Sequence, residues 1–224
     1  MPLVSAFCAT LCALGLVFAD PPRAEQPGQL TVRVKMNFDR SVTTFVWASV
    51  REETAAIWNE YGVKLVWAAT DAVATSDDAA LQLEAVVVPP RPDRMRTPRQ
   101  VLGRTMVDAH GDPRGPIYLY LDPIELLLRQ RETNNTLMRD AEFARAVARV
   151  LAHELGHMLI GTDHDLTGLM RVKFSVEQLA RPDRRPFRLA DGGVDRLRER
   201  IATLVASAGD KRPVTFAATW GSKK

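Results

Sequence analysis

The strongest secondary-structure signal in the sequence is a long amphipathic helix, predicted for about residues 139–160. Apolar side chains recur there at every third or fourth position: Phe143, Val147, Val150, Leu151, Leu155 and Met158. This spacing places them along one face of a helix, which predicts that the helix packs against a core. Gly161 follows, and glycine readily takes the left-handed conformation that ends a helix and turns the chain back.

The sequence before this helix predicts a sheet. Residues 30–38 alternate apolar and polar side chains, which is typical of a half-buried strand. A helix over residues 41–61, ended by Gly62, and a second strand over 63–69 complete a β-α-β unit, which we expect to be right-handed with parallel strands. Further strands are predicted for residues 81–88, 101–109 and 117–121, and a further helix for 124–131.

Two shorter helices are predicted after Gly161, so the chain as a whole indicates an α+β fold. The run from Ser175 to Gln178 has the residue types of a capping box, which would begin a short helix. One face of a final helix is formed by Val194, Leu197, Ile201, Leu204, Val205 and Ala208. We expect Arg196, Arg198 and Arg200 on the solvent-exposed side of that helix.

The first 19 residues are typical of a secretory signal peptide. They contain no Asp, Glu, Lys or Arg, and an apolar stretch ends in the small-residue pattern Val17-Phe18-Ala19. The stretch is shorter than the ~20 apolar residues that span a bilayer, so we expect no stable membrane association after cleavage. We therefore predict a secreted or periplasmic protein with a short N-terminal segment (20–29), one domain (30–208, subdivided at 161/162) and a loosely ordered tail (209–224).

Charge and cysteine content exclude several kinds of function. The formal net charge of +3 is too small to predict binding to nucleic acid or to an anionic membrane. Cys8 and Cys12 are the only cysteines, and both lie in the predicted signal peptide. The mature chain would therefore have no disulfide, no cysteine-ligated metal and no thiolate nucleophile.

Three of the four histidines lie within twelve residues, at His153, His157 and His164. Residues i and i+4 share one face of a helix, so the imidazoles of His153 and His157 can reach the same ion. Glu154 lies about 100° further around the helix, where its carboxylate can contact a metal-bound water without ligating the metal. Zinc held by neutral nitrogen ligands lowers the pKa of such a water towards ~7, and a nearby carboxylate can take its proton.

This segment resembles the metzincin clan of zinc metallopeptidases, whose pattern is HExxHxxGxxH followed by a turn that contains a methionine. His-Glu-Leu-Gly-His is similar to the matrixin version, and the run from Asp165 to Met170 is similar to the segment that enters the methionine turn. The resemblance implies Zn²⁺ ligated by His153, His157 and His164, with Glu154 as general base. It also implies supporting roles for Gly161, after the helix, and for Met170, as an apolar floor under the metal.

The fold implied by the resemblance is zincin-like. It has a twisted, mixed five-stranded sheet with a backing helix and an active-site helix, followed by a small, mostly helical C-terminal subdomain. The implied upper subdomain covers residues 30–161 and the lower one 162–208.

The sequence departs from the metzincin pattern at one place, where three residues separate the second histidine from the glycine, giving HExxHxxxGxxH. The extra residue lengthens the helix by ~1.5 Å and rotates its end by ~100°, unless a local bulge absorbs it. His164 is the expected third ligand. Asp163, Asp165 and Glu177 are the alternatives, because carboxylate oxygens also ligate zinc.

We therefore expect a secreted, zinc-dependent endopeptidase that acts on proteins or peptides. Its substrate would lie extended along an edge strand at residues 101–109, and Glu154 would pass a proton from water to the leaving amine. The alternative is a secreted binding protein on the same scaffold, with structural zinc closed by four protein ligands. A third possibility is a zinc hydrolase that acts on non-peptide amides.

Overall fold

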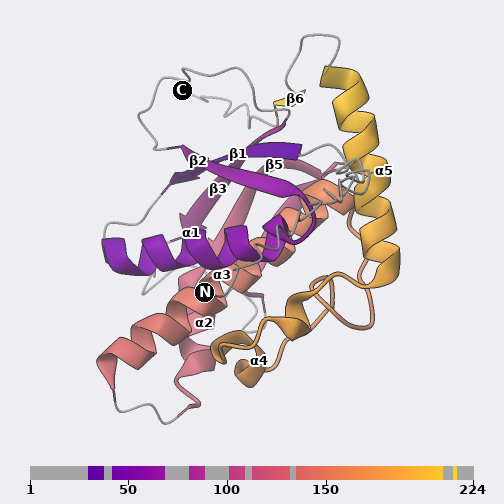
Figure 1. The fold of residues 1–224 in the computed structure, drawn as a ribbon. Coiled ribbons are helices and arrows are strands. Elements are labelled where there is room, and N and C mark those ends of the chain that lie inside the picture. The colour runs from indigo at the N-terminus through magenta and orange to yellow at the C-terminus, as the bar shows by residue number, and fades with distance from the viewer. Residues whose placement is uncertain are drawn as a thin grey trace, which may run out of the picture.

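A computed structural model describes residues 30–37, 42–68, 81–88, 101–108, 113–131, 135–208 and 214–215. The predicted signal peptide, residues 20–29 and all of the predicted tail except Val214–Thr215 lie outside these ranges. The described chain forms one mixed sheet with helices packed against it (Figure 1). None of the helices in these ranges has the length and apolar character needed to cross a membrane.

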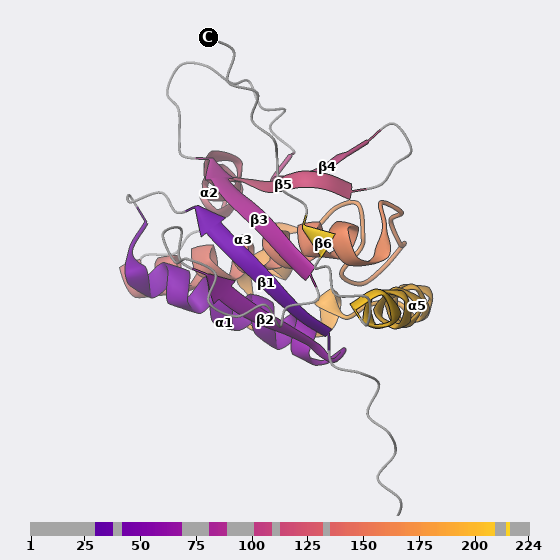
Figure 2. The same ribbon diagram turned by 90° about the horizontal axis from the view of Figure 1, so that it is seen from above.

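The sheet has the strand order β2-β1-β3-β5-β4. Its strands are β1 (Leu30–Asn37), β2 (Val63–Ala68), β3 (Leu81–Val88), β4 (Gly103–Val107) and β5 (Pro113–Tyr120). Only β4 runs antiparallel to its neighbour, and the short strand β6 (Val214–Thr215) pairs with the start of β3. The direction of the strands turns from β1 and β3 to β5 and β4, as in a twisted sheet (Figure 2). The predicted mixed, five-stranded α+β architecture is confirmed.

The opening β-α-β unit forms with parallel strands, as the sequence predicts. Alternate residues of β1 are buried, and β1 pairs in parallel with both β2 and β3. Helix α1 (Thr44–Asn59) begins after Thr43, whose hydroxyl accepts the N–H of Val46. The chain leaves α1 through Gly62, whose φ of 75° suits a residue without a Cβ.

The helix that carries the histidines is α3 (Thr136–Ile160), which begins three residues earlier than predicted. The reason is Asn135, whose side chain accepts hydrogen bonds from the N–H groups of Leu137 and Met138 and so caps the helix. Helix α3 packs against α1 and against β4 and β5. Every residue from Ala146 to Ile160 is buried, because other helices and strands pack around α3.

Two predicted boundaries near the sheet edge differ from the structure. Strand β5 begins at Pro113, four residues before the predicted start, and its extra residues pair with β4 through a bulge. Leu121 was expected to end this strand but begins helix α2 (Leu121–Leu128). The proline- and glycine-containing run at residues 113–116 resembles a turn in sequence, yet the pairing with β4 holds it extended.

The C-terminal part contains α4 (Val176–Ala180), the 3₁₀ helix η1 (Arg185–Phe187) and α5 (Asp191–Ala208). Both hydrogen bonds of the predicted capping box are present between Ser175 and Gln178. On α5 the side chains of Leu197, Ile201 and Leu204 are buried as predicted, whereas those of Val205 and Ala208 lie outside the described part. Of the three arginines expected on the solvent side, Arg198 is exposed, whereas Arg196 and Arg200 are part-buried, and Arg196 forms an ion pair with Asp165.

Candidate metal centre

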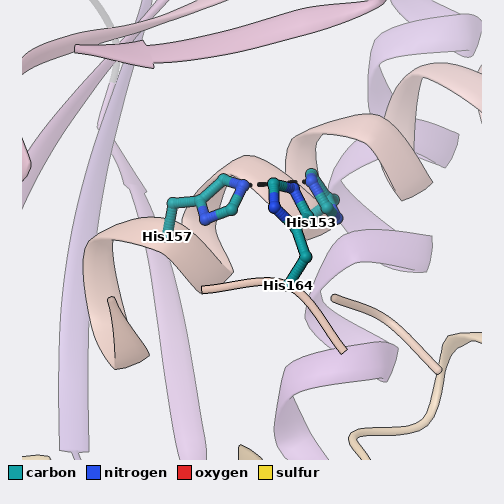
Figure 3. A group of neighbouring side chains, drawn as sticks. All are labelled: His153, His157 and His164. Atoms are coloured by element: carbon teal, nitrogen blue, oxygen red, sulfur yellow. Dashed lines mark hydrogen bonds between the residues drawn. The ribbon is translucent and has the colours of Figure 1, made fainter. Parts of the chain in front are cut away.

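The three clustered histidines meet at one point (Figure 3). His153 and His157 lie on consecutive turns of α3, and their Nε2 atoms are 3.1 Å apart. His164 reaches them from the loop after α3, so that one nitrogen of each ring lies within 4.8 Å of the others. Three imidazole nitrogens at this separation can hold a metal ion.

Hydrogen bonds to the backbone orient the two helical imidazoles. His153 Nδ1 lies 2.8 Å from the carbonyl oxygen of Leu169, and His157 Nδ1 lies 3.2 Å from that of Gly161. A carbonyl can only accept, so each Nδ1 carries the hydrogen and each Nε2 keeps its lone pair. Backbone carbonyls thus fix the tautomer in which both Nε2 atoms are free to ligate.

Burial keeps these two imidazoles neutral at pH 7. It lowers the pKa of His153 from its ordinary value to about 4, against the opposing effect of the bond to Leu169. Burial also lowers the pKa of His157. A metal therefore competes with few protons for these two nitrogens near neutral pH.

The extra residue between His157 and Gly161 lengthens the helix. Helix α3 remains regular to Ile160, so no bulge absorbs the residue. Gly161 then takes φ 97° and ψ 177°, and the chain returns far enough to stack the His164 ring on that of His153, with centroids 5.4 Å apart. The longer helix end and the glycine turn together bring His164 to the group.

The carboxylates considered as alternative third ligands are not in this group. Asp165 instead accepts from Arg196 Nη2, and Glu177, on α4, lies 3.9 Å from Arg131. Asp163 is exposed on the return loop. The arrangement therefore favours His164 as the third ligand.

Glu154 is buried beside the histidines and contacts the edge strand. The Oγ1 of Thr105, on β4, lies 2.8 Å from Glu154 Oε2 and 3.1 Å from the Glu154 carbonyl oxygen. Burial raises the pKa of Glu154 to about 7, and the bonds from Thr105 oppose this rise. A carboxyl group with a pKa close to 7 can both take and give a proton at neutral pH.

Sequence reasoning missed two residues that position Glu154, Thr105 and Gly103. A Cβ on Gly103 would lie 2.8 Å from both Cγ and Oε1 of Glu154, so only a glycine leaves room for the carboxylate. A glycine within a predicted strand often marks such a close approach, and this was the available signal for Gly103. Nothing in the sequence marks Thr105, because its partner is 49 residues away.

Met170 is fully buried, and its Sδ packs against Gly156 on α3. The turn before it is held by the N–H of Asp165, which donates to the Met170 carbonyl, and by that of Leu169, which donates to Arg188. Gly168, at φ 78°, lies so close to the Arg188 carbonyl that a side chain would not fit. Met170 therefore lies against the histidine helix, and its role as a floor under a metal stays a prediction.

A cleft of about 760 Å³ contains the three histidines and Glu154. One wall is the strand β4 with the residues before it, and another is the segment Val172–Phe174. Because β4 is the last strand of the sheet, its outer edge borders this cleft. The candidate metal centre is thus open to a molecule lying along the sheet edge.

The sequence matches no family model and no curated protein. Among solved structures, the fold is similar to that of archaemetzincin from Methanopyrus kandleri, with a TM-score of 0.46 and 12% sequence identity. The similarity covers 78% of this chain and 96% of that chain. This likeness is distant, and the chemistry of the site follows from its own side chains.

Proposed function

We propose that the protein is a secreted or periplasmic, zinc-dependent endopeptidase. In this proposal His153, His157 and His164 hold Zn²⁺, and Glu154 is the general base. The observation that carries the proposal is the convergence of three imidazoles, two of them neutral and with fixed tautomers, beside a buried carboxylate at a sheet edge.

The donor atoms suit zinc. Zn²⁺ binds imidazole nitrogen well, and catalytic sites commonly offer three protein ligands and leave a fourth position open. The group of described residues has three nitrogens and no carboxylate, which fits such an open site. A structural site would be closed by a fourth protein ligand.

The residues around the metal position have distinct tasks. Bound Zn²⁺ supplies Lewis-acid chemistry, which polarises a substrate carbonyl and acidifies a water molecule. Glu154 takes the proton of the attacking water and then gives it to the leaving amine nitrogen. The Thr105 hydroxyl, by donating to Oε2, holds the Glu154 carboxylate in one orientation during these transfers.

The main-chain groups at the outer edge of β4 favour a peptide as the substrate. The Leu102 carbonyl accepts from Tyr120, so the alternation of an antiparallel pair turns the main-chain groups of Gly103 and Thr105 outward, away from β5. The Thr105 N–H already bonds to the Glu154 carboxylate. An extended peptide can bind the Gly103 groups and the Thr105 carbonyl as an added strand, which places a peptide carbonyl next to the histidines.

Metal analysis and peptide cleavage test the proposal together. We expect the purified mature chain to contain about one equivalent of zinc, and to cleave a peptide library in a chelator-sensitive way. His153→Ala should lose the metal. Glu154→Gln should keep it but lower turnover by about 10²–10⁴-fold, since it removes the base alone.

The control variant is Glu177→Gln, which removes an exposed carboxylate of α4 and should change neither zinc content nor turnover. Wild-type cleavage by Glu154→Gln would refute the assigned base. Zinc without cleavage of any peptide would favour the binding-protein alternative, and cleavage limited to small amides would favour the third possibility. N-terminal sequencing of the exported protein tests cleavage after Ala19.

A further inference from the structure

Asp165, directly after the candidate ligand His164, is held by an arginine from a distant helix. Arg196 Nη2, on α5, lies 3.2 Å from Oδ1 and 3.3 Å from Oδ2 of Asp165. The Asp165 side chain is only 17% exposed, so this ion pair is partly shielded from water. A shielded pair of this kind holds its partners more firmly than an ion pair on the surface.

Further contacts fix Asp165 between the methionine turn and α5. Its N–H donates to the Met170 carbonyl over 2.9 Å. A Cβ on Gly193, in the first turn of α5, would lie 3.3 Å from Asp165 Oδ2, so a glycine there lets the helix approach the carboxylate. The positive end of the α5 dipole adds to the attraction of Arg196 for Asp165.

His164 has no comparable anchor of its own. His153 and His157 are fixed by α3 and by backbone carbonyls, whereas His164 is exposed on a loop. Within the described ranges, the His164 side chain forms no hydrogen bond or ion pair, and its ring contacts are with the other two histidines. The position of its imidazole therefore depends on the residues that flank it in the loop, and Asp165 is the next one.

We propose that the Asp165–Arg196 ion pair positions His164 for metal binding, so that α5 controls the zinc affinity of the site. This inference rests on the proposed function, because it concerns the same metal. Arg196 contacts none of the three histidines and acts through Asp165, which makes it a positioning residue.

Zinc affinity of the Arg196→Ala variant tests the inference, measured by competition with a chromophoric chelator. We expect the affinity to fall by about 10–100-fold, the usual effect of losing a residue that orients a ligand. Loss of a nearby positive charge would by itself strengthen the binding of a cation, so a weaker affinity cannot come from charge alone. Arg196→Lys should recover part of the affinity.

Two further variants complete the test. Arg198→Ala removes an exposed arginine of α5 that pairs with Asp195, and it should bind zinc like the wild type. Asp165→Asn should weaken zinc binding, and adding Arg196→Ala to it should cost little more, because both act through one contact. Thermal melting of each metal-free variant checks that it is folded. If Arg196→Ala does not fold, the zinc affinities of Arg196→Lys and Asp165→Asn provide the test.

The outcomes separate this inference from the proposed function. Wild-type zinc affinity in folded Arg196→Ala would overturn the inference and leave the peptidase proposal intact. Additive effects of Arg196→Ala and Asp165→Asn would also overturn it. A wild-type protein that binds no zinc would refute both.

Discussion

The Thr105 backbone N–H bonds to the Glu154 carboxylate, and the described side chain that donates to it is the Thr105 hydroxyl, 2.8 Å from Oε2. We predict that Thr105→Val, which keeps the shape but removes the donor, lowers kcat about tenfold, equivalent to ~1.4 kcal/mol. Zinc content should not change, because Thr105 contacts none of the histidines. Steady-state kinetics with metal analysis measure both quantities. Thr105→Ser is the control and should retain most of the rate, whereas a wild-type kcat in Thr105→Val would contradict the prediction.

Gly156 gives the second prediction at the scale of residues. Replacing a helical glycine by alanine ordinarily stabilises a helix by ~1 kcal/mol. Here the new Cβ would overlap the buried Sδ of Met170, so we expect Gly156→Ala to destabilise the metal-free protein by about 1–3 kcal/mol. Denaturant unfolding measures this change. In a Met170→Ala background the overlap is gone, and the same substitution should be neutral or stabilising; equal effects in both backgrounds would disprove the contact.

The sequence predicts the parts of the site that are local in the chain. The spacing of His153, Glu154 and His157 on one helix already determines which side chains face the same point. Contacts between Thr105 and Glu154, or between Arg196 and Asp165, join residues 49 and 31 positions apart. No periodicity encodes them, because they arise only when the sheet edge and α5 pack against α3.

At the scale of elements, the central contact between helices is the buried Arg149. Its guanidinium binds Glu53 of α1 at 2.9 Å and donates to the carbonyls of Gln178, Leu179, Arg181 and Asp183. It also lies 4.5 Å from the Phe187 ring centroid, and Phe187 stacks on Phe174, which contacts His153. One side chain thus joins α1 and α3 to α4 and to the segment between α4 and η1.

We predict that Arg149→Met destabilises the metal-free protein by about 3–5 kcal/mol, as when one partner of a buried ion pair is removed. The four carbonyls lose this donor, while Glu53 keeps its ion pair with Arg184. Denaturant unfolding again gives the free energy. The matched control is Arg145→Met, which loses one bond to the Ala180 carbonyl and should cost about 1 kcal/mol. Equal losses of unfolding free energy in the two variants would show that the contacts of Arg149 stabilise the protein no more than those of Arg145.

Element types were predictable from the sequence, and element ends less so. Strand β3 was predicted to the residue, because its first residues alternate apolar and polar side chains, three valines follow, and the proline pair after Val88 stops the pattern. The start of α3 was missed because Asn135 both interrupts the preceding segment and caps the next helix. Strand β5 was missed over residues 113–116 because pairing with β4 overrides the turn tendency of Pro and Gly there.

At the scale of the whole molecule, the candidate metal site joins parts of the chain that are separate in sequence. Helix α3 gives two imidazoles, the return loop gives a third, and α5 holds that loop through Arg196 and Asp165. A single cluster of buried apolar side chains extends from Leu30 of β1 to Leu204 of α5. An ion bound at the three histidines therefore binds only the assembled fold and should stabilise all of it.

We predict that zinc at about 100 times its dissociation constant stabilises the protein by ~2.7 kcal/mol. For a chain of this size that raises Tm by about 5–10 °C. His164→Ala removes one of three ligands and should abolish most of the rise at the same zinc concentration, with little change in the metal-free Tm, because His164 is exposed. Asp163→Asn, one residue away in the same loop, should show the full rise. Calorimetry with and without zinc measures all three proteins, and a full rise in His164→Ala would mean that the metal is held without the return loop.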